Sequence, residues 1–359
     1  MTRVAVAVSG GMDSLLALAL LKEQGQDLLA LHGFFLPPDD EAREKTAALE
    51  EQCARLDIPF AAVDLSAEFA RLVISPFVAS YLSGRTPNPC ALCNRELKFG
   101  LLFAAARDMG ATRLATGHYA RLVDHPIYCR GLARGADPVK EQSYFLGLVR
   151  ARDLRCAVFP LGDWRKKDVP AALVARGLTP PLASESQEVC FVPGDDYKTF
   201  LEASGAKLPG PGAIVHADGR TLGRHRGLWR YTLGQRRGLG VAFAEPLYVL
   251  GADREENALL VGGAELARTR GCRAEGVNVL VPPALWPDKL FVRTRYRQAA
   301  ARAEVRLDGE SLEVVFAAPH DLAAPGQVAA VYDASGVVLA AGIIAENSSE
   351  GLAGRAGMA

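Results

Sequence analysis

The first fourteen residues place a short apolar run directly before a glycine-rich turn that opens a helix. The run at 3–8 is continuous and apolar, which is typical of a parallel strand buried on both faces. The turn Ser9-Gly10-Gly11-Met12-Asp13-Ser14 follows, and a helix is predicted at 15–24. Glycines let backbone amides crowd around an anion, and a helix N-terminus adds a positive dipole there. We therefore expect a nucleotide phosphate-binding loop after the first strand.

Strands and helices alternate from residue 4 to about residue 191, in a rhythm typical of a doubly wound parallel α/β sheet. Further strands are expected at 28–35, 60–65 and 113–116, and helices at 41–56 and 95–109. The later chain has short strand patterns that suit a small β-barrel, at 291–298, 303–307, 311–316 and 327–332. We expect four parts: a nucleotide-binding catalytic domain (1–198), a small central domain (199–266), a C-terminal β-barrel (267–346) and a flexible tail (347–359).

The overall charge is balanced, with 41 basic and 41 acidic side chains in 359 residues. A polyanionic partner must therefore be held by a local patch and not by net charge. The seven cysteines are an odd number, which argues against a closed set of disulfides and favours a reducing cytoplasm. The apolar start is too short for a signal peptide, and no run of about 18 apolar residues predicts a membrane span.

The glycine turn differs from two common nucleotide-binding fingerprints. The chain has neither Gly-x-x-x-x-Gly-Lys-Ser/Thr nor Gly-x-Gly-x-x-Gly, so neither a kinase-type P-loop nor a Rossmann dinucleotide site is predicted. Ser9 and Ser14 supply hydroxyl donors, whereas an acid beside phosphate is unusual unless it binds Mg²⁺, as we expect of Asp13. The alternative is a plain glycine turn in which Asp13 caps the helix.

Two motifs contain three cysteines that are candidates for a chemical role. The segment 84–94 contains two prolines and a Cys-x-x-Cys, Cys90 and Cys93, and runs into the helix expected from residue 95. A thiol near a helix N-terminus has a lowered pKa, so we expect Cys93 to favour the thiolate. The second motif, at 184–191, contains Cys190. The alternative is that these cysteines are small buried hydrophobes, as we expect of Cys53, Cys129, Cys156 and Cys272.

Two arginine-rich stretches favour an anionic partner. Between residues 219 and 241 there is no acid, Trp229 and Tyr231 are interleaved, and arginine occupies 220, 224, 226, 230, 236 and 237. The alternative for this stretch is a solvated loop. In the barrel region a strand would put three guanidinium groups on one face, those of Arg293, Arg295 and Arg297. Such a row of like charges is costly without an anion.

Taken in order, these segments resemble a known family. The turn at 9–14 is similar to that of the PP-loop ATP pyrophosphatases, which cleave ATP between the α- and β-phosphates and adenylate a carbonyl or carboxylate oxygen. The segments 84–94, 115–119, 140–146, 186–191 and 231–240 follow in the order seen in the tRNA-specific 2-thiouridylases (the MnmA family). The resemblance spans about residues 3–344. It implies a PP-loop fold and a tRNA sulfurtransferase that adenylates O2 of the wobble uridine and replaces it with sulfur.

The resemblance also assigns roles to residues. It implies that Cys93 is the nucleophile and that Cys190 carries a persulfide, with a disulfide between them after transfer. ATP and Mg²⁺ are expected at Ala7, Val8, Ser9, Gly10, Gly11, Met12, Asp13, Ser14, Gly33 and Gly117. The tRNA and its flipped base are expected at Asn88, Pro89, Cys90, His118, Lys140, Glu141, Gln142, Arg295, Tyr296 and Gln327. We expect a monomer whose sulfur donor is a cysteine desulfurase, a relay protein or sulfide.

The chain departs from the family pattern in two places. Cys90 stands where the best-known members have an Asp proposed to assist acid–base steps. Cys90, Cys93 and Cys190 are therefore also candidate ligands of a [4Fe–4S] cluster whose fourth iron would bind hydrosulfide, and the persulfide and cluster routes both stay open. The second departure is Leu31-His32-Gly33-Phe34-Phe35, in place of a Met-Lys-Asn-Trp-like segment, so that the adenine contact near Gly33 is only loosely placed.

Two other functions compete with tRNA thiolation. A PP-loop synthetase acting on a small molecule would explain the first loop but neither the cysteine motifs nor the arginines. A non-catalytic RNA-binding protein with a decayed nucleotide loop predicts loss of Asp13 or Cys93, and both are present.

Overall fold

The computed structural model describes residues 2–181, 189–192, 194 and 196–348. The expected first strand, β1 (Val4–Ala7), lies at the centre of a five-stranded sheet with the order β3-β2-β1-β4-β7. The other members are β2 (Leu28–Phe34), β3 (Phe60–Asp64), β4 (Arg113–Ala115) and β7 (Ala157–Val158). All four pairings are parallel. The predicted doubly wound α/β sheet is confirmed, and β1 is buried because both of its faces are covered.

The sheet grows outward from β1 in both directions. The chain first adds β2 and β3 on one side of β1, and then returns to add β4 and β7 on the other side. In such sheets ligands bind at the carboxyl ends of the strands, at the point where the strand order reverses. The glycine turn after β1 and the Thr116-Gly117-His118 loop after β4 meet at this edge.

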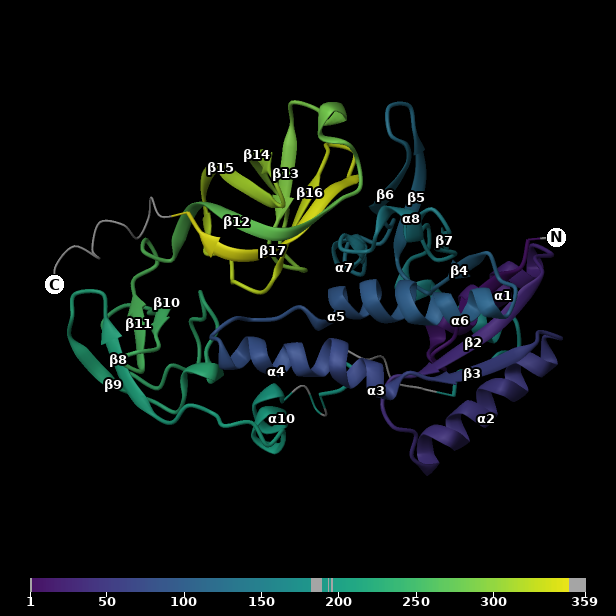
Figure 1. The fold of residues 1–359 in the computed structure, drawn as a ribbon, viewed down its shortest axis with the longest axis horizontal. Helices are drawn as coiled ribbons and strands as arrows, with labels where there is room; N and C mark the ends of the chain where they lie inside the picture. The colour runs from purple at the N-terminus through teal and green to yellow at the C-terminus, as the bar shows by residue number, and fades with distance from the viewer. Residues whose placement is uncertain (1, 182–188, 193, 195, 349–359) are drawn as a thin grey trace.

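Helices cover the sheet and extend from it. They include α1 (Met12–Glu23), α2 (Asp40–Arg55), α3 (Ser66–Phe69), η1 (Ala70–Ile74), α4 (Ser75–Leu82), α5 (Pro89–Leu92), η2 (Cys93–Leu102) and α6 (Phe103–Asp108). Figure 1 shows two long helical rods, one formed by α3, η1 and α4 and the other by α5, η2 and α6, that lead away from the sheet. The helix expected at 95–109 is therefore part of a longer one, which begins at Pro89 because Asn88 accepts the amide hydrogen of Ala91 at 3.1 Å.

Short elements follow the second helical rod along the chain. They are the hairpin β5 (Ala120–His125) and β6 (Cys129–Arg134), and the helices α7 (Ser143–Leu146), α8 (Ala151–Leu154), η3 (Lys166–Asp168), α9 (Val169–Val174) and α10 (Tyr197–Ala203). No helix in the described ranges is long and apolar enough to cross a membrane.

Two β-structures follow. The central one has the order β10-β11-β8-β9, with β8 (Gly212–His216), β9 (Thr221–His225), β10 (Tyr248–Asp253) and β11 (Ala258–Gly262), and the helical turn η5 (Leu228–Arg230) follows β9. The second is a closed barrel of β12 (Arg268–Val279), β13 (Leu290–Arg293), β14 (Ala301–Asp308), β15 (Ser311–Asp321), β16 (Val328–Tyr332) and β17 (Val338–Asn347), with the short turn η6 (Pro283–Leu285) after β12. The predicted C-terminal barrel is confirmed.

One strand of the barrel is shorter than predicted. The strand expected at 291–298 ends at Arg293, and the chain turns over 294–298. The predicted row of three guanidinium groups on one strand face is therefore wrong. Arg293 is buried, and Arg295 reaches back to the carbonyl oxygens of Leu233 and Leu322.

The barrel shares a hydrophobic core with the first domain. Leu31 and Phe99 of the α/β layers belong to the same buried cluster as Val328 and Ala341 of the barrel. Tyr144 lies at the junction, fully buried, and its hydroxyl donates to the carbonyl oxygen of Val328 at 3.0 Å. The barrel is therefore packed against the domain that carries the glycine turn, through α7 and the β5–β6 hairpin.

Candidate active site

The glycine turn has the geometry of an anion-binding loop. Gly10 has a φ of 82°, a conformation that favours glycine, and the turn is braced by the Ser9 amide, which donates to Ser14 Oγ at 3.1 Å. Gly11 occupies the N-cap position of α1, and no side chain caps the helix. The first amides of α1 therefore remain available to an anion. The alternative in which Asp13 caps this helix is wrong, because its carboxylate binds elsewhere.

Asp13 is held by two side chains from distant parts of the sequence. The Tyr119 hydroxyl donates to Asp13 Oδ1 at 2.7 Å, and Lys166 Nζ lies 2.7 Å from each carboxylate oxygen. Sequence reasoning missed both partners. Their only signals were a Tyr directly after His118 in a recognised motif and a basic pair, Lys166-Lys167, with no pattern of its own.

Gly117 packs directly on the glycine turn. A Cβ at this position would lie 2.9 Å from the carbonyl carbon of Asp13 and 3.0 Å from the Ser14 nitrogen, so only glycine fits. The other predicted nucleotide residue, Gly33, lies at the carboxyl end of β2, where a Cβ would meet Phe35 at 3.1 Å and Leu102 at 3.2 Å. The same end of β2 is tied to the turn by His32, whose Nδ1 lies 2.8 Å from the Val8 carbonyl oxygen. The structure therefore gathers the predicted ATP residues at one edge.

His118 is a buried, neutral imidazole. The residue is 7% exposed, its Nδ1 lies 2.8 Å from Thr116 Oγ1, and its ring centroid lies 6.4 Å from that of Phe99 and 6.2 Å from that of Phe159. Burial, with the nearby charge of Lys98, holds the pKa of His118 well below its usual value. At neutral pH this residue donates or accepts a hydrogen bond without carrying charge.

The cysteine loop places Cys93 in the interior. Cys93 is 8% exposed, and burial raises its pKa to about 12, with a smaller opposing effect of Lys98. Burial likewise raises the pKa of Cys90 to about 11. The expectation of a thiolate at Cys93 is wrong for this state. The helix starts four residues earlier, at Pro89, so Cys93 lies beyond the turn where the dipole acts, and desolvation dominates.

The structure brings the three predicted cysteines together around one lysine. The electrostatic influence of Cys190 raises the pKa of both Cys90 and Cys93, and that of Lys98 lowers the pKa of all three thiols. Cys190 is exposed at the surface, although the surrounding protein raises its pKa, and all three are free thiols. The rest of the motif, at 184–188, lies outside the described residues. Lys98 was not singled out from the sequence, although it follows Cys93 on the same helix.

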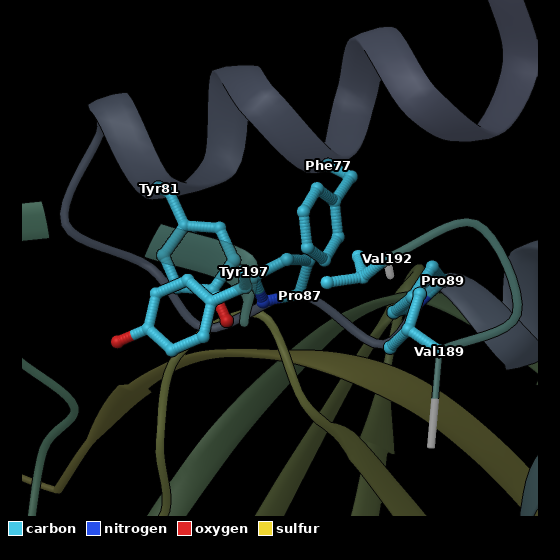
Figure 2. Close-up of a pocket in the computed structure, with 7 residues that line it drawn as sticks. All are labelled: Phe77, Tyr81, Pro87, Pro89, Val189, Val192 and Tyr197. Carbon is cyan, nitrogen blue, oxygen red and sulfur yellow. The ribbon is translucent and has the colours of Figure 1, made fainter. Parts of the chain in front are cut away.

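A small apolar cavity backs this cysteine loop (Figure 2). It has a volume of about 90 Å³ and is lined by Phe77, Tyr81, Pro87, Pro89, Val189, Val192 and Tyr197. The rings of Tyr81 and Tyr197 stack with their centroids 4.6 Å apart. The lining joins the two prolines of the Cys90 loop to the residues on either side of Cys190 and Phe191, so packing of α4 and α10 holds both cysteine segments in place.

The described residues contain no preplaced metal site. In the described part of the chain, no three His, Cys, Asp or Glu side chains are placed to hold a metal ion. The [4Fe–4S] site expected at Cys90, Cys93 and Cys190 stays a prediction.

Several residues predicted to contact tRNA are structural contacts here. Glu141 is 4% exposed and forms a buried ion pair with Arg293 of the barrel. The side chain of Gln142 accepts the amide hydrogen of Tyr119 at 3.0 Å. Gln327 Nε2 donates to the carbonyl oxygens of Thr86 at 3.1 Å and Pro87 at 2.9 Å. These contacts support the loop that leads to Cys90 and the backbone of Tyr119, whose hydroxyl binds Asp13.

The remaining predicted contacts lie around the same junction. Lys140 is partly buried, and its backbone amide donates to Asp137 at 3.1 Å. The ring of Tyr296 packs on Phe145 with the centroids 4.4 Å apart, and Asn88 is buried as the cap of α5.

The arginine-rich stretch of the central domain retains a basic surface. Arg220 pairs with Asp218 and Arg230 with Glu202, and Trp229 is buried, with its indole nitrogen donating to Pro209. Trp229 therefore does not contribute an exposed aromatic face. Four arginines are exposed and form no ion pair within the described ranges, namely Arg224, Arg226, Arg236 and Arg237.

These features define the class of the protein. A parallel sheet carries an uncapped glycine loop at the point where the strand order reverses, and two β-domains follow it. The protein is therefore a nucleotide-binding α/β protein of the PP-loop type with a multidomain extension. Three family models match in succession, a tRNA methyl transferase HUP domain at 2–194, a tRNA methyl transferase PRC-barrel domain at 198–263 and an aminomethyltransferase β-barrel domain at 269–344. The chain belongs to the family of tRNA-specific 2-thiouridylases.

Close relatives carry that name. A tRNA-specific 2-thiouridylase MnmA of Nitratidesulfovibrio vulgaris (Miyazaki F) is 56% identical over 346 residues, which cover 95% of this chain and 99% of the relative. The protein of the same name from Oleidesulfovibrio alaskensis is 55% identical, with 95% and 99% of the two chains covered. That from Lawsonia intracellularis is 47% identical, with 95% and 98% covered.

Proposed function

We propose that this protein uses ATP to replace O2 of the wobble uridine of tRNA with sulfur. The proposal depends on one observation: the three thiols lie close to the glycine turn that would bind the nucleotide. Lys98 acts electrostatically on Cys90, Cys93, Cys190 and His118, and the neighbouring Gly117 packs on Asp13. A sulfur carrier is thus close to the loop that would activate an oxygen.

The chemistry requires both halves of this site. O2 of uracil is a poor leaving group until its attack on the α-phosphate of ATP forms an AMP ester and releases pyrophosphate. The terminal sulfur of a persulfide on Cys190 then attacks C2, and the C–O bond to AMP breaks. The Cys93 thiolate attacks the Cys190 sulfur, which forms a disulfide and releases the thiocarbonyl product. An external dithiol reduces the disulfide and is itself oxidised, and a donor persulfide then passes its terminal sulfur to the Cys190 thiol and is left as a thiol.

The burial of the thiols fits a reaction in which Cys93 becomes reactive only after the tRNA has bound. Cys93, with its pKa raised to about 12, is protonated in the free protein and is protected from oxidation. His118 is neutral and lies in the loop that packs on Asp13, so it is placed to bind the uracil without adding charge. The exposed Cys190 is accessible to a protein donor that carries a persulfide and passes its terminal sulfur to the Cys190 thiol.

For binding of the tRNA, we propose the exposed arginines of the central domain as the main phosphate contacts. We propose Lys140, Arg295 and Tyr296 as further tRNA contacts; Tyr296 packs on Phe145 of the first domain, and Gln327 of the barrel holds the cysteine loop. We also propose domain limits at 198, 266 and 346 for the three folded parts.

The test is mass analysis of wobble nucleosides from a strain that lacks this gene, complemented with wild type or with Cys93→Ser. We expect 2-thiouridine derivatives to disappear in the deletion, to return with wild type and to stay absent with Cys93→Ser. Cys156→Ser, which changes a partly buried cysteine outside the two motifs, is the matched control and should restore them. Unchanged 2-thiouridine in the deletion strain contradicts the proposal.

The family models mention methyl transfer and the relatives thiolation. The cysteine motifs favour thiolation, because methyl transfer has no use for a persulfide. The same mass analysis separates the two, since adding a methyl group and exchanging oxygen for sulfur give different mass changes.

Iron and sulfide analysis of protein purified without oxygen, with Cys90→Ser as the control, tests the cluster route.

A further inference from the structure

Asp13 is an acid in a loop that should receive the polyphosphate of ATP. Both of its oxygens already have partners, because Lys166 Nζ lies 2.7 Å from each and the Tyr119 hydroxyl is 2.7 Å from Oδ1. The pair is partly buried, with 14% of the Lys166 side chain and 29% of the Asp13 side chain exposed. An ammonium group thus lies beside Asp13 in the first turn of α1, a helix whose N-terminus has no side-chain cap.

A structural salt bridge alone explains this arrangement poorly. A carboxylate in the first turn of a helix is already stabilised by the helix dipole and gains little from a lysine. Without the lysine, however, Asp13 would repel the polyphosphate. Ion pairs at such exposures contribute little to folding, whereas a cation beside phosphate contributes directly to binding.

The Lys166 backbone is anchored, whereas its side chain has a long flexible stem. Its amide donates to Asp137 Oδ2 at 2.9 Å, and the other oxygen of Asp137 accepts the amides of Val139 and Lys140 at 2.9 and 3.1 Å. The stem of a lysine then lets the ammonium group move by a few ångströms without moving η3.

We propose that Lys166 is a further ATP-binding residue that neutralises Asp13 in the free protein and transfers its ammonium group to the polyphosphate when Mg²⁺–ATP binds. The transfer releases a carboxylate oxygen of Asp13, a ligand that Mg²⁺ prefers. Tyr119 keeps its hydrogen bond to Asp13 and holds the carboxylate in place. Asp137 is a positioning residue that acts through the Lys166 backbone.

The experiment measures the dissociation constants of ATP and of adenosine for full-length Lys166→Met and for Lys167→Met. Lys167 is the exposed neighbour on the same turn, so its variant carries the same charge change away from Asp13. We expect Lys166→Met to weaken ATP binding roughly ten- to a hundredfold, the range of a hydrogen bond to a charged group, and to leave adenosine binding unchanged. Lys167→Met should bind both as wild type does.

Other outcomes overturn the inference. Equal ATP binding by Lys166→Met and wild type shows that the lysine only pairs with Asp13, and equal loss of ATP and adenosine shows a structural role. If Lys166→Met does not fold, Lys166→Arg decides: retained ATP affinity supports the phosphate contact, and a loss as large as that expected for methionine contradicts it. The inference rests on ATP as the nucleotide. If wild type itself does not bind ATP, the proposed function fails, and that result is distinct from a variant that binds as wild type does.

Discussion

At the scale of single residues, burial decides the protonation of the reactive groups. Cys93, Cys90 and His118 are all pushed toward their neutral forms, and Lys98 is the cation that acts on each of them. Lys98 is partly buried and forms no ion pair within the described residues. Its positive charge has no paired anion there, so it favours the thiolates and opposes the rise in thiol pKa that burial causes.

Replacing Lys98 with Met should make the thiols less reactive. Removal of the charge takes away the effect that lowers the three thiol pKa values, so alkylation of Cys190 and Cys93 by iodoacetamide should slow at a given pH and recover only at higher pH. Peptide mass spectrometry after timed alkylation measures this. Arg95→Met is the matched control, because Arg95 is already paired with Glu96 at 2.6 Å. Equal alkylation rates in Lys98→Met and wild type would refute the effect of Lys98 on the thiol pKa values.

The buried neutral His118 should make the protein sensitive to mild acid. Its pKa in the folded protein lies well below the unfolded value of about 6.5, so the unfolded chain binds more protons as pH falls. Stability is therefore complete above about pH 6.5 and decreases below it, by up to about 1.4 kcal/mol per pH unit. Melting temperatures from pH 7.5 to 5 should fall less for His118→Gln than for wild type. Parallel curves would contradict this account.

At the scale of elements, the sequence predicted the repeating units better than their ends. The strand, glycine turn and helix at the start were predicted because an apolar run, glycines and a helical pattern agree there. The strand expected at 291–298 ended at Arg293, because the buried carboxylate of Glu141, 152 residues earlier, fixes that guanidinium. The low pKa expected for Cys93 failed for a similar reason, since only the folded structure shows how deeply the loop is buried.

The Glu141–Arg293 pair should be important for docking of the barrel. Breaking a buried pair leaves an uncompensated charge, so Glu141→Gln should lower the free energy of unfolding by about 3–5 kcal/mol. Combining it with Arg293→Met should recover part of that stability. Urea denaturation measures both. The more exposed Glu202–Arg230 pair is the control, and Glu202→Gln should cost less than about 1 kcal/mol. Similar costs at the two sites would show that the junction does not depend on this pair.

At the scale of the whole molecule, a neutral chain must concentrate positive charge to hold RNA. Composition predicted a local patch, and the structure reduces it to four exposed arginines, because Arg220 and Arg230 are paired and Trp229 is buried. The partners that remove Arg220, Arg230 and Trp229 from the patch are Asp218, Glu202 and Pro209. No local sequence pattern marks them as partners.

Arg236 and Arg237 should contribute to tRNA affinity through phosphates. Arg236→Gln with Arg237→Gln should weaken tRNA binding and reduce the slope of log affinity against log salt by roughly 0.7–0.9 for each phosphate that is no longer neutralised. Filter binding at several salt concentrations provides the slope. Arg220→Gln, which removes an arginine already neutralised by Asp218, should leave the slope unchanged. A double variant with the wild-type slope would place the tRNA elsewhere.

The central claim is that adenylation at the glycine turn and sulfur transfer at the cysteines are successive steps on one tRNA base. Single-turnover reactions with unmodified tRNA, ATP and a sulfur donor test it by following pyrophosphate release and 2-thiouridine formation together. Wild type should produce both, Asp13→Asn neither, and Cys190→Ser should release pyrophosphate without forming 2-thiouridine. Thiolation by Cys190→Ser at the wild-type rate, or thiolation by wild type without pyrophosphate release, would contradict the account.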